Sequence, residues 1–225
     1  MTRPLLPPAY ELVVVEDGRD VALSALAAAG EAADGTVFWN ERSDRLDMAL
    51  LLEPEAPAAE TALVHPVMAL AVAEALGALL PPLVPVSFAF PQTFLLDGAR
   101  LGCLRLRMAP AAVGAVPAWC LLDLVIDIAP AANEPGQEPW RTCLADAGAG
   151  GLPAASLLEG VCRHFLAWMH RWGEDGFAPV AEALNARNGA AATPAGRGRL
   201  TTRGGLLQDG CEHSLHLLLL DEGAV

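Results

Sequence analysis

The stretch FAFPQTFLLDGARLGCLRL, residues 88–106, decides the fold of this chain. Val84–Phe90 and Phe94–Leu96 are apolar segments with the composition of β-strands, and a proline and two polar residues separate them. Asp97-Gly98 is a strong signal for a two-residue hairpin turn. From Leu101 onward, successive side chains alternate between two faces, as they do along a strand. The stretch therefore predicts antiparallel strands joined by tight turns.

The residues on either side of this stretch predict four helices and several further strands. The helices are expected at Asp20–Ala29, Thr61–Leu80, Ser156–Trp172 (with Ser156 as N-cap) and Phe177–Ala186. Further strands are expected at Tyr10–Val15, Thr36–Trp39, Leu46–Leu52, Trp119–Ile128 and Ser214–Leu220. This order of elements predicts an α+β fold in which a mixed, mostly antiparallel sheet is packed by helices.

A change of composition near the C-terminus suggests the domain organisation. Residues 1–188 carry almost all of the expected elements and should form one catalytic-type domain. Residues 189–204 are rich in Gly, Ala, Thr and Arg without periodicity, which is typical of a linker. Residues 205–225 are expected to form a small C-terminal β module.

The overall composition argues against several classes of partner. A net charge of −13 disfavours nucleic acids and anionic membrane surfaces, which are polyanions themselves. The apolar stretches are interrupted before they reach the ~20 residues that a membrane span needs, and no secretory signal is visible. We therefore expect a cytoplasmic protein whose five scattered cysteines are reduced and mostly buried.

The basic residues exclude some mechanisms. All fourteen are arginines, so the chain contains no lysine. This rules out lysine Schiff bases, phosphate loops of the Gly-Lys-Ser/Thr type and a lysine general acid. A Gly-x-Ser-x-Gly nucleophile elbow is also absent from the sequence.

Several segments resemble the motifs of the biotin and lipoate protein ligase superfamily. AFPQT, residues 89–93, matches the family's Lys-Trp-Pro-Asn-Asp, and DGARLGC, residues 97–103, matches its Gly-x-Lys-hydrophobic-Gly-Gly/Ala at the same spacing. Residues 30–39 stand where the family carries the ligand loop Gly-Arg-Gly-x-x-Gly-x-x-Trp, and residues 15–19 stand where it carries Asp-Ser-Thr-Asn. The order of elements is similar along nearly the whole chain.

The resemblance implies a chemistry and a site. In the family, a carboxylic acid attacks the α-phosphate of ATP, and a target lysine captures the acyl-adenylate. The implied catalytic residue is Arg100, which stands at the position of the family's lysine and is expected to face an enclosed cavity. The implied ligand-binding residues are Gly35, Thr36, Phe38, Trp39, Phe90, Pro91, Thr93, Gly98 and Gly102. The implied ligands are ATP or an acyl-adenylate with biotin, lipoate or another small carboxylic acid, the implied protein partner is of the acyl-carrier type, and no metal site is implied.

The chain departs from the family where that chemistry is most demanding. Arg100 keeps a positive charge, but a guanidinium cannot place one compact charge between two anionic groups as an ammonium does. The ligand loop has lost both arginines and has gained Glu31 and Asp34, which would repel a triphosphate. Two hypotheses follow: a ligase-like acyltransferase with weak or no ATP-dependent ligation, or a noncatalytic descendant that binds a small ligand or a protein.

Each candidate residue also has a structural interpretation. Arg100 can be a surface residue beside a hairpin turn, while Phe38, Trp39 and Phe90 can be core residues. Structural roles are the favoured interpretation for three further groups: His164 with Trp168 and Trp172, His213 with His216, and Asp123 with Asp127.

Overall fold

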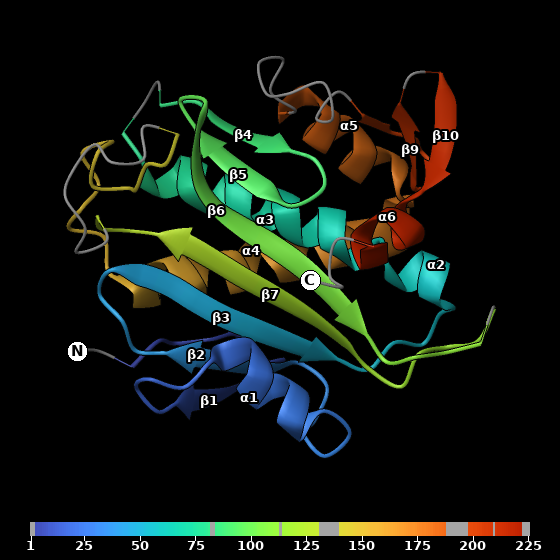
Figure 1. Ribbon diagram of the computed structural model, residues 1–225, viewed down its shortest axis with the longest axis horizontal. Helices are drawn as coiled ribbons and strands as arrows, with labels where there is room; N and C mark the ends of the chain where they lie inside the picture. The colour runs from blue at the N-terminus through green and yellow to red at the C-terminus, as the bar shows by residue number, and fades with distance from the viewer. Residues whose placement is uncertain are drawn as a thin grey trace.

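The computed structural model describes residues 3–81, 84–112, 114–130, 140–187, 198–208 and 210–221. A seven-stranded sheet in the order β1-β2-β3-β7-β6-β5-β4 forms its centre (Figure 1). The strands are β1 (Glu11–Val15), β2 (Thr36–Asn40), β3 (Arg45–Leu52), β4 (Val86–Ala89), β5 (Thr93–Leu96), β6 (Ala99–Met108) and β7 (Cys120–Asp127). Strands β1 and β2 pair in parallel, and the other neighbours in this sheet pair antiparallel. The predicted α+β class is confirmed.

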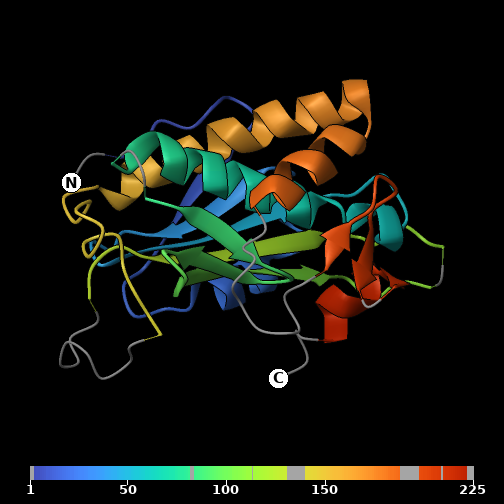
Figure 2. The ribbon, with the colours of Figure 1, turned by 90° about the horizontal axis from the view of Figure 1, so that it is seen from above.

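Helices lie on both faces of the sheet. Helices α3 (Val64–Leu79), α4 (Ala154–Asp175) and α5 (Ala178–Arg187) form a layer on one face, which we call the helix face (Figure 2). Helix α1 (Val21–Ala28) lies on the opposite face, which we call the open face (Figure 1). A short helix, α2 (Ala58–Thr61), precedes α3. The large hydrophobic core lies between the sheet and the helix face.

Helix α3 is the central element of this core. Twelve of its residues are buried, as its almost uniformly apolar sequence predicts. Among the described residues, the segment Ala58–Leu79 is long and apolar enough to cross a membrane, and 78% of its apolar window is buried inside the fold. Its apolar surface is therefore covered by the sheet and by α4, whose Gly160 lets that helix approach Ala75 closely.

The predicted hairpin turn is confirmed. Leu96 pairs with Ala99, so that Asp97 and Gly98 form a two-residue connection between β5 and β6. Both connecting residues have positive φ angles, 49° and 81°. A type I′ turn requires this conformation, and Asp-Gly is one of the pairs that adopt it readily.

The C-terminal residues form a small three-stranded sheet and a helix. These are β8 (Arg199–Leu200), β9 (Gly205–Gln208), β10 (Cys211–Ser214) and α6 (Leu215–Asp221). Strand β8 falls inside the predicted linker 189–204, whose residues 189–197 lie outside the described part of the chain. Leu200 and Leu206 belong to the main hydrophobic core, which therefore continues into this module.

Two sequence predictions about helices are wrong. The predicted strand Ser214–Leu220 is helix α6, because Leu215 and Leu219, one helical turn apart, are both buried in the core and leucine has a high helix propensity. Helix α4 begins at Ala154 after Pro153, so Ser156 lies in its first turn and is not the N-cap.

Candidate functional site

The open face of the sheet is only partly covered by a described helix. Helix α1 packs its Val21 and Ala25 against Phe38 of β2 and Ala49 of β3, which makes a second, smaller core. Ala49 stands directly opposite Asp123 of β7, and Asp123 stands directly opposite Arg105 of β6, so these residues share the open face. Charged side chains continue along this face at Arg45, Asp47, Asp127 and Arg107.

A cavity of about 220 Å³ lies where the β1–α1 turn meets the β2–β3 turn. We call it the turn cavity. It is lined by Gly18, Arg19, Asp20, Asn40, Arg42, Arg45 and Asp47. Because β2 ends and β3 begins here, the cavity sits at one end of the sheet.

Local hydrogen bonds hold the two turns in place. Asp20 is the N-cap of α1, and its carboxylate accepts a hydrogen bond from the backbone N–H of Leu23 at 2.8 Å. The β1–α1 turn therefore ends at Asp20. The carbonyl oxygen of Asp44 accepts from the N–H groups of Ile128 and Ala129, both at 2.8 Å. The β2–β3 turn is therefore tied to the residues that follow β7.

The charges in the turn cavity are largely paired. The Arg42 guanidinium donates two hydrogen bonds to Asp44, which holds the pKa of that carboxyl below its usual value and raises the pKa of Arg42. Arg45 pairs with Asp47 at 3.2 Å. Burial nevertheless raises the pKa of Asp47, because desolvation outweighs the attraction of Arg45.

One donor in the turn cavity is left over. The Nε atom of Arg45 is buried and has no hydrogen-bond partner among the described residues. A buried donor without an acceptor costs about 1–3 kcal/mol, so it is uncommon in a folded protein. The lining carries three arginines and two aspartates, and Glu16 and Asp44 pair with Arg19 and Arg42 from beside it. The acceptor that Nε of Arg45 lacks is therefore what a ligand could supply.

Asp123 is a second polar feature of the open face. Its carboxylate is buried, and Arg105 pairs with it across the strands at 3.7 Å. Burial raises the pKa of Asp123, although Arg105 and Arg107 both oppose that shift. Asp123 lies on β7, which is directly next to the strand of Asp47, β3, but it does not line the turn cavity. Among the described residues, no group of three or more His, Cys, Asp or Glu side chains is placed to hold a metal ion.

The structure places Arg100 differently from the expected enclosed position. Arg100 is exposed at the start of β6, and it is not among the residues that line the turn cavity. Its backbone N–H donates to the Trp140 carbonyl at 2.7 Å, and its carbonyl accepts from Thr142 at 2.9 Å. The expectation of an enclosed guanidinium is therefore corrected, because Arg100 is an exposed residue. A role for Arg100 in catalysis stays a prediction.

The aromatic residues of the predicted site are distributed over two cores. Phe38 packs under α1 on the open face, whereas Trp39 belongs to the core on the helix face. Phe90 is in that same core, where its ring lies 5.3 Å from the ring of Phe88 in an edge-to-face arrangement. Neighbouring residues on a strand point to opposite faces, so Phe38 and Trp39 do not line one pocket.

The last part of the predicted ligand loop, residues 36–39, belongs to strand β2. Thr36 pairs with Leu51 at the end of β2 that is remote from the turn cavity. Gly35 precedes it with a φ of +76°, and a Cβ there would lie 2.4 Å from the Ala9 carbonyl oxygen. The backbone conformation and the close packing therefore both require a glycine at this position. Strand β2 separates Gly35 and Thr36 from Asn40 at its other end, so neither of them lines the turn cavity.

The remaining predicted residues lie along β5 and β6. Thr93 is half-buried opposite Cys103, which in turn stands opposite Val125 in β7. Pro91 is half-buried between β4 and β5, Gly98 is exposed in the hairpin turn, and Gly102 is a close-packed residue of β6. None of them lines the turn cavity. Ligand contacts at these residues stay predictions.

Sequence reasoning missed most of the turn cavity. The segment 15–19 was recognised as the position of a family motif, and Arg19 belongs to the cavity. Arg42 and Arg45 flank a tight turn between two strands, and that pair of cations in an acidic chain was an available signal. Their proximity to Arg19 could not be read from the sequence, because more than twenty residues separate them from it.

The chain was compared with protein families and with curated proteins. The family model described as "Biotin/lipoate A/B protein ligase family" matches residues 6–186. No curated protein matches the chain.

Solved structures share the fold. A biotin protein ligase-like protein of unknown function from Silicibacter sp. TM1040 is 29% identical, with a TM-score of 0.82 over 96% of this chain and 99% of that one. The biotin protein ligase of Aquifex aeolicus in complex with biotin and ATP is 15% identical, with a TM-score of 0.64 over 92% of this chain and 96% of that one. A biotin acetyl coenzyme A carboxylase synthetase from Helicobacter pylori is 13% identical, with a TM-score of 0.58 over 91% and 98% of the two chains.

Proposed function

Because this chain belongs to the biotin/lipoate A/B protein ligase family, we propose that it binds a small carboxylic acid in the turn cavity. The observation that supports the proposal is the buried Nε donor of Arg45, which has no acceptor among the described residues. A carboxylate offers two oxygens in the plane that a guanidinium fork recognises. A volume of about 220 Å³ suits a small acid alone better than an acid together with a nucleotide.

The neighbouring side chains would orient such a ligand. Asp47 pairs with Nη2 of Arg45 at 3.2 Å, so a ligand that reached the buried Nε would approach the guanidinium from another side. Asn40 is buried at the end of β2 and supplies an amide that can either donate or accept. Together they would discriminate between a carboxylic acid and its neutral analogues.

Formation of an acyl-adenylate is not part of this proposal. The chain has no lysine to stabilise the charge that builds on the phosphate. The β2–β3 connection consists of residues 41–44 and contains no glycine, so it lacks the adaptable backbone N–H groups with which glycine-rich loops hold phosphates. We expect no exchange of pyrophosphate into ATP in the presence of biotin, lipoate or hexanoate.

Replacing Arg45 tests the proposal directly. We expect the wild-type protein to bind biotin, lipoate or another short acid, and Arg45→Gln to weaken that binding by roughly tenfold to a hundredfold, as the loss of a charge-assisted hydrogen bond predicts. Isothermal titration calorimetry of the wild type and the variant measures the difference. Arg163→Gln, at an exposed position of α4, is the matched control and should bind like the wild type. Equal affinity in Arg45→Gln and wild type would exclude the turn cavity as the site.

Acyl transfer from a preactivated donor is the second candidate. The observation that favours it is the family match over residues 6–186, which covers the segment around Arg100. The acceptor would be an amine of an acyl-carrier-type protein, and transfer would not require ATP. Turnover of an acyl-adenylate or acyl thioester that is lost in Arg100→Ala would support this candidate. A protein that binds the acid but turns over neither donor would be a binding protein.

A further inference from the structure

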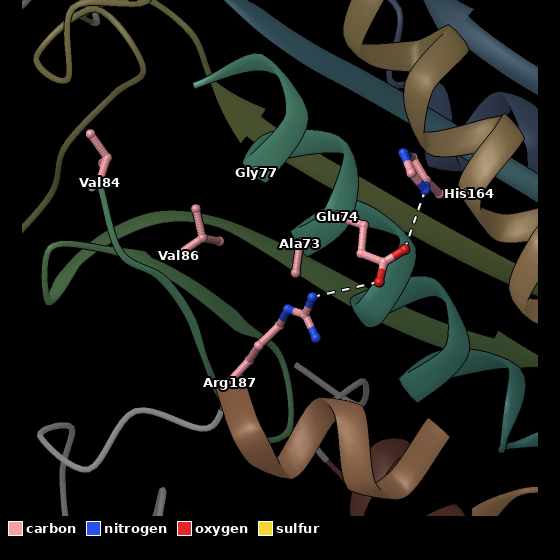
Figure 3. Close-up of a pocket in the computed structure, with 7 residues that line it drawn as sticks. All are labelled: Ala73, Glu74, Gly77, Val84, Val86, His164 and Arg187. Atoms are coloured by element: carbon pink, nitrogen blue, oxygen red, sulfur yellow. Dashed lines mark ion pairs between the residues drawn. The ribbon is translucent and has the colours of Figure 1, made fainter. Parts of the chain in front are cut away.

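A larger pocket lies on the helix face, on the other side of the sheet from the turn cavity. It has a volume of about 480 Å³, within the range of small-molecule sites, and we call it the Glu74 pocket (Figure 3). Its polar end is formed by Glu74 of α3, His164 of α4 and Arg187 of α5. Its apolar wall is formed by Ala73 and Gly77 of α3 with Val84 and Val86 from the segment that enters β4.

The Glu74 carboxylate contacts three donor groups of the protein. One oxygen accepts from the indole N–H of Trp168 at 2.8 Å and lies 3.3 Å from Nδ1 of His164. The other oxygen lies 3.5 Å from Nη2 of Arg187, so that Glu74 stands between His164 and Arg187 (Figure 3). His164 and Trp168 thus link α4 to α3 through Glu74. The ion pair with Arg187 offsets the charge of Glu74 and weakens its attraction for a cationic ligand.

Arg187 keeps donors in reserve. A guanidinium has five N–H groups. Arg187 uses Nη2 toward Glu74 and Nη1 toward the carbonyl oxygen of Ala183 at 3.1 Å, which leaves further N–H groups for a ligand. The side chain is only one-third exposed, and Figure 3 shows its guanidinium extending into the pocket. The polar end therefore has N–H donors left for an acceptor, and a carboxylate suits the guanidinium fork.

Gly77 leaves the apolar wall open. It lies inside helix α3, where glycine is less favourable than alanine. A Cβ at this position would meet no atom within 4 Å, so close packing does not require a glycine. Gly77 is exposed, and the space over it can hold a short apolar chain.

We propose that the Glu74 pocket binds a second ligand, a small monocarboxylate with a short aliphatic chain. Its carboxylate would pair with Arg187, and its chain would lie along Ala73, Gly77 and two valines, Val84 just before β4 and Val86 at its first residue. This site is independent of the turn cavity, from which the sheet separates it. The protein would then hold two acids at once, one on each face.

The Trp168 indole N–H reports on this pocket through its hydrogen bond to Glu74. In a two-dimensional ¹H–¹⁵N spectrum, titration with hexanoate should shift the Trp168 indole peak saturably, and Trp168→Phe identifies that peak. Hexylamine and 1-hexanol have the same chain without the carboxylate and should give no saturable shift. A shift with hexylamine in place of hexanoate would overturn the proposal, and so would the absence of a saturable shift with hexanoate.

Two variants probe the two ends of the pocket. Arg187→Gln removes the charge and should weaken hexanoate binding at least about tenfold. Gly77→Leu keeps every charge and fills the apolar end, so it should abolish the shift. Arg163→Gln and Gly173→Leu are the matched controls on exposed positions of α4 and should retain it. Arg45→Gln should also retain it, which separates this site from the turn cavity. Unchanged affinity in Arg187→Gln or in Gly77→Leu would refute the proposal.

Discussion

Replacing Gly102 by alanine is expected to destabilise the protein by about 3 kcal/mol, at the upper end of what overpacking costs. Gly102 lies in β6 opposite Ile126 of β7, in the middle of the sheet. A Cβ there would lie 2.1 Å from the carbonyl oxygen of Val125 and 3.0 Å from the Cα of Ile126. Backbone atoms cannot move aside as a flexible side chain can, so β6 and β7 would have to separate locally.

Urea unfolding followed by circular dichroism measures this effect. Gly173→Ala is the matched control, because Gly173 is an exposed residue inside α4 and a Cβ there would meet no atom within 4 Å. That change should stabilise the protein by roughly 0.5–1 kcal/mol through the higher helix propensity of alanine. If Gly102→Ala unfolds at the same urea concentration as the wild type, β6 and β7 do not pack as closely as described.

The second large effect is a loss of stability in acid that depends on His65. His65 is fully buried in the first turn of α3, beside the rings of Phe88 and Phe90, which contact each other. One ring nitrogen, Nε2, lies 3.2 Å from the carbonyl oxygen of Leu104, and the other, Nδ1, has no partner among the described residues. Burial lowers the pKa of His65 to about 4, because a charged ring would lack solvation there.

The sign of the pH effect follows from this lowered pKa. Between pH 6.5 and 4 the unfolded chain binds a proton at His65 and the folded chain does not, so the free energy of unfolding falls as the pH falls. Above pH 6.5 the protonation of His65 does not reduce the free energy of unfolding, and at pH 5 it reduces it by roughly 2 kcal/mol. Asp47 and Asp123, whose pKa values are raised, act in the opposite direction.

A variant without the imidazole isolates the His65 contribution. The aspartate contributions are common to His65→Leu and the wild type, so they cancel in the difference between the two proteins. We expect the stability of wild type relative to His65→Leu to fall by about 2 kcal/mol between pH 7.5 and pH 5, measured by urea unfolding at each pH. A difference that is constant over this range would show that His65 can be protonated inside the folded protein.

Most of the secondary structure could be predicted from local patterns. The Asp97-Gly98 turn, the strands on either side of it and the uniformly apolar helix α3 are confirmed, because turn chemistry and side-chain periodicity act over a few residues. The run after Ser214 was assigned to a strand because neither its composition nor its length separates a short leucine-rich helix from a strand. Burial of Leu215 and Leu219 on one helical face decided it.

The candidate sites could be predicted from the sequence only in part. Motif spacing correctly identified the family, but it assigned the ligand to residues that the fold distributes over two cores and two ends of the sheet. Phe38 and Trp39 are adjacent in the chain and lie on opposite faces of β2. A motif records the order of residues along the chain, while the pleat of the strand decides which face each side chain occupies.

The sequence by itself determined the element types, the α+β class, the family and the absence of lysine chemistry, since these depend on composition and on contacts between near neighbours. Only the tertiary structure decided which charged groups meet. Arg19, Arg42 and Arg45 come together because β1 pairs with β2 and β2 pairs with β3, and Glu74, His164 and Arg187 meet because three helices pack on one face. Such sites are created by pairing and packing between segments far apart in the chain, and no local pattern specifies that register.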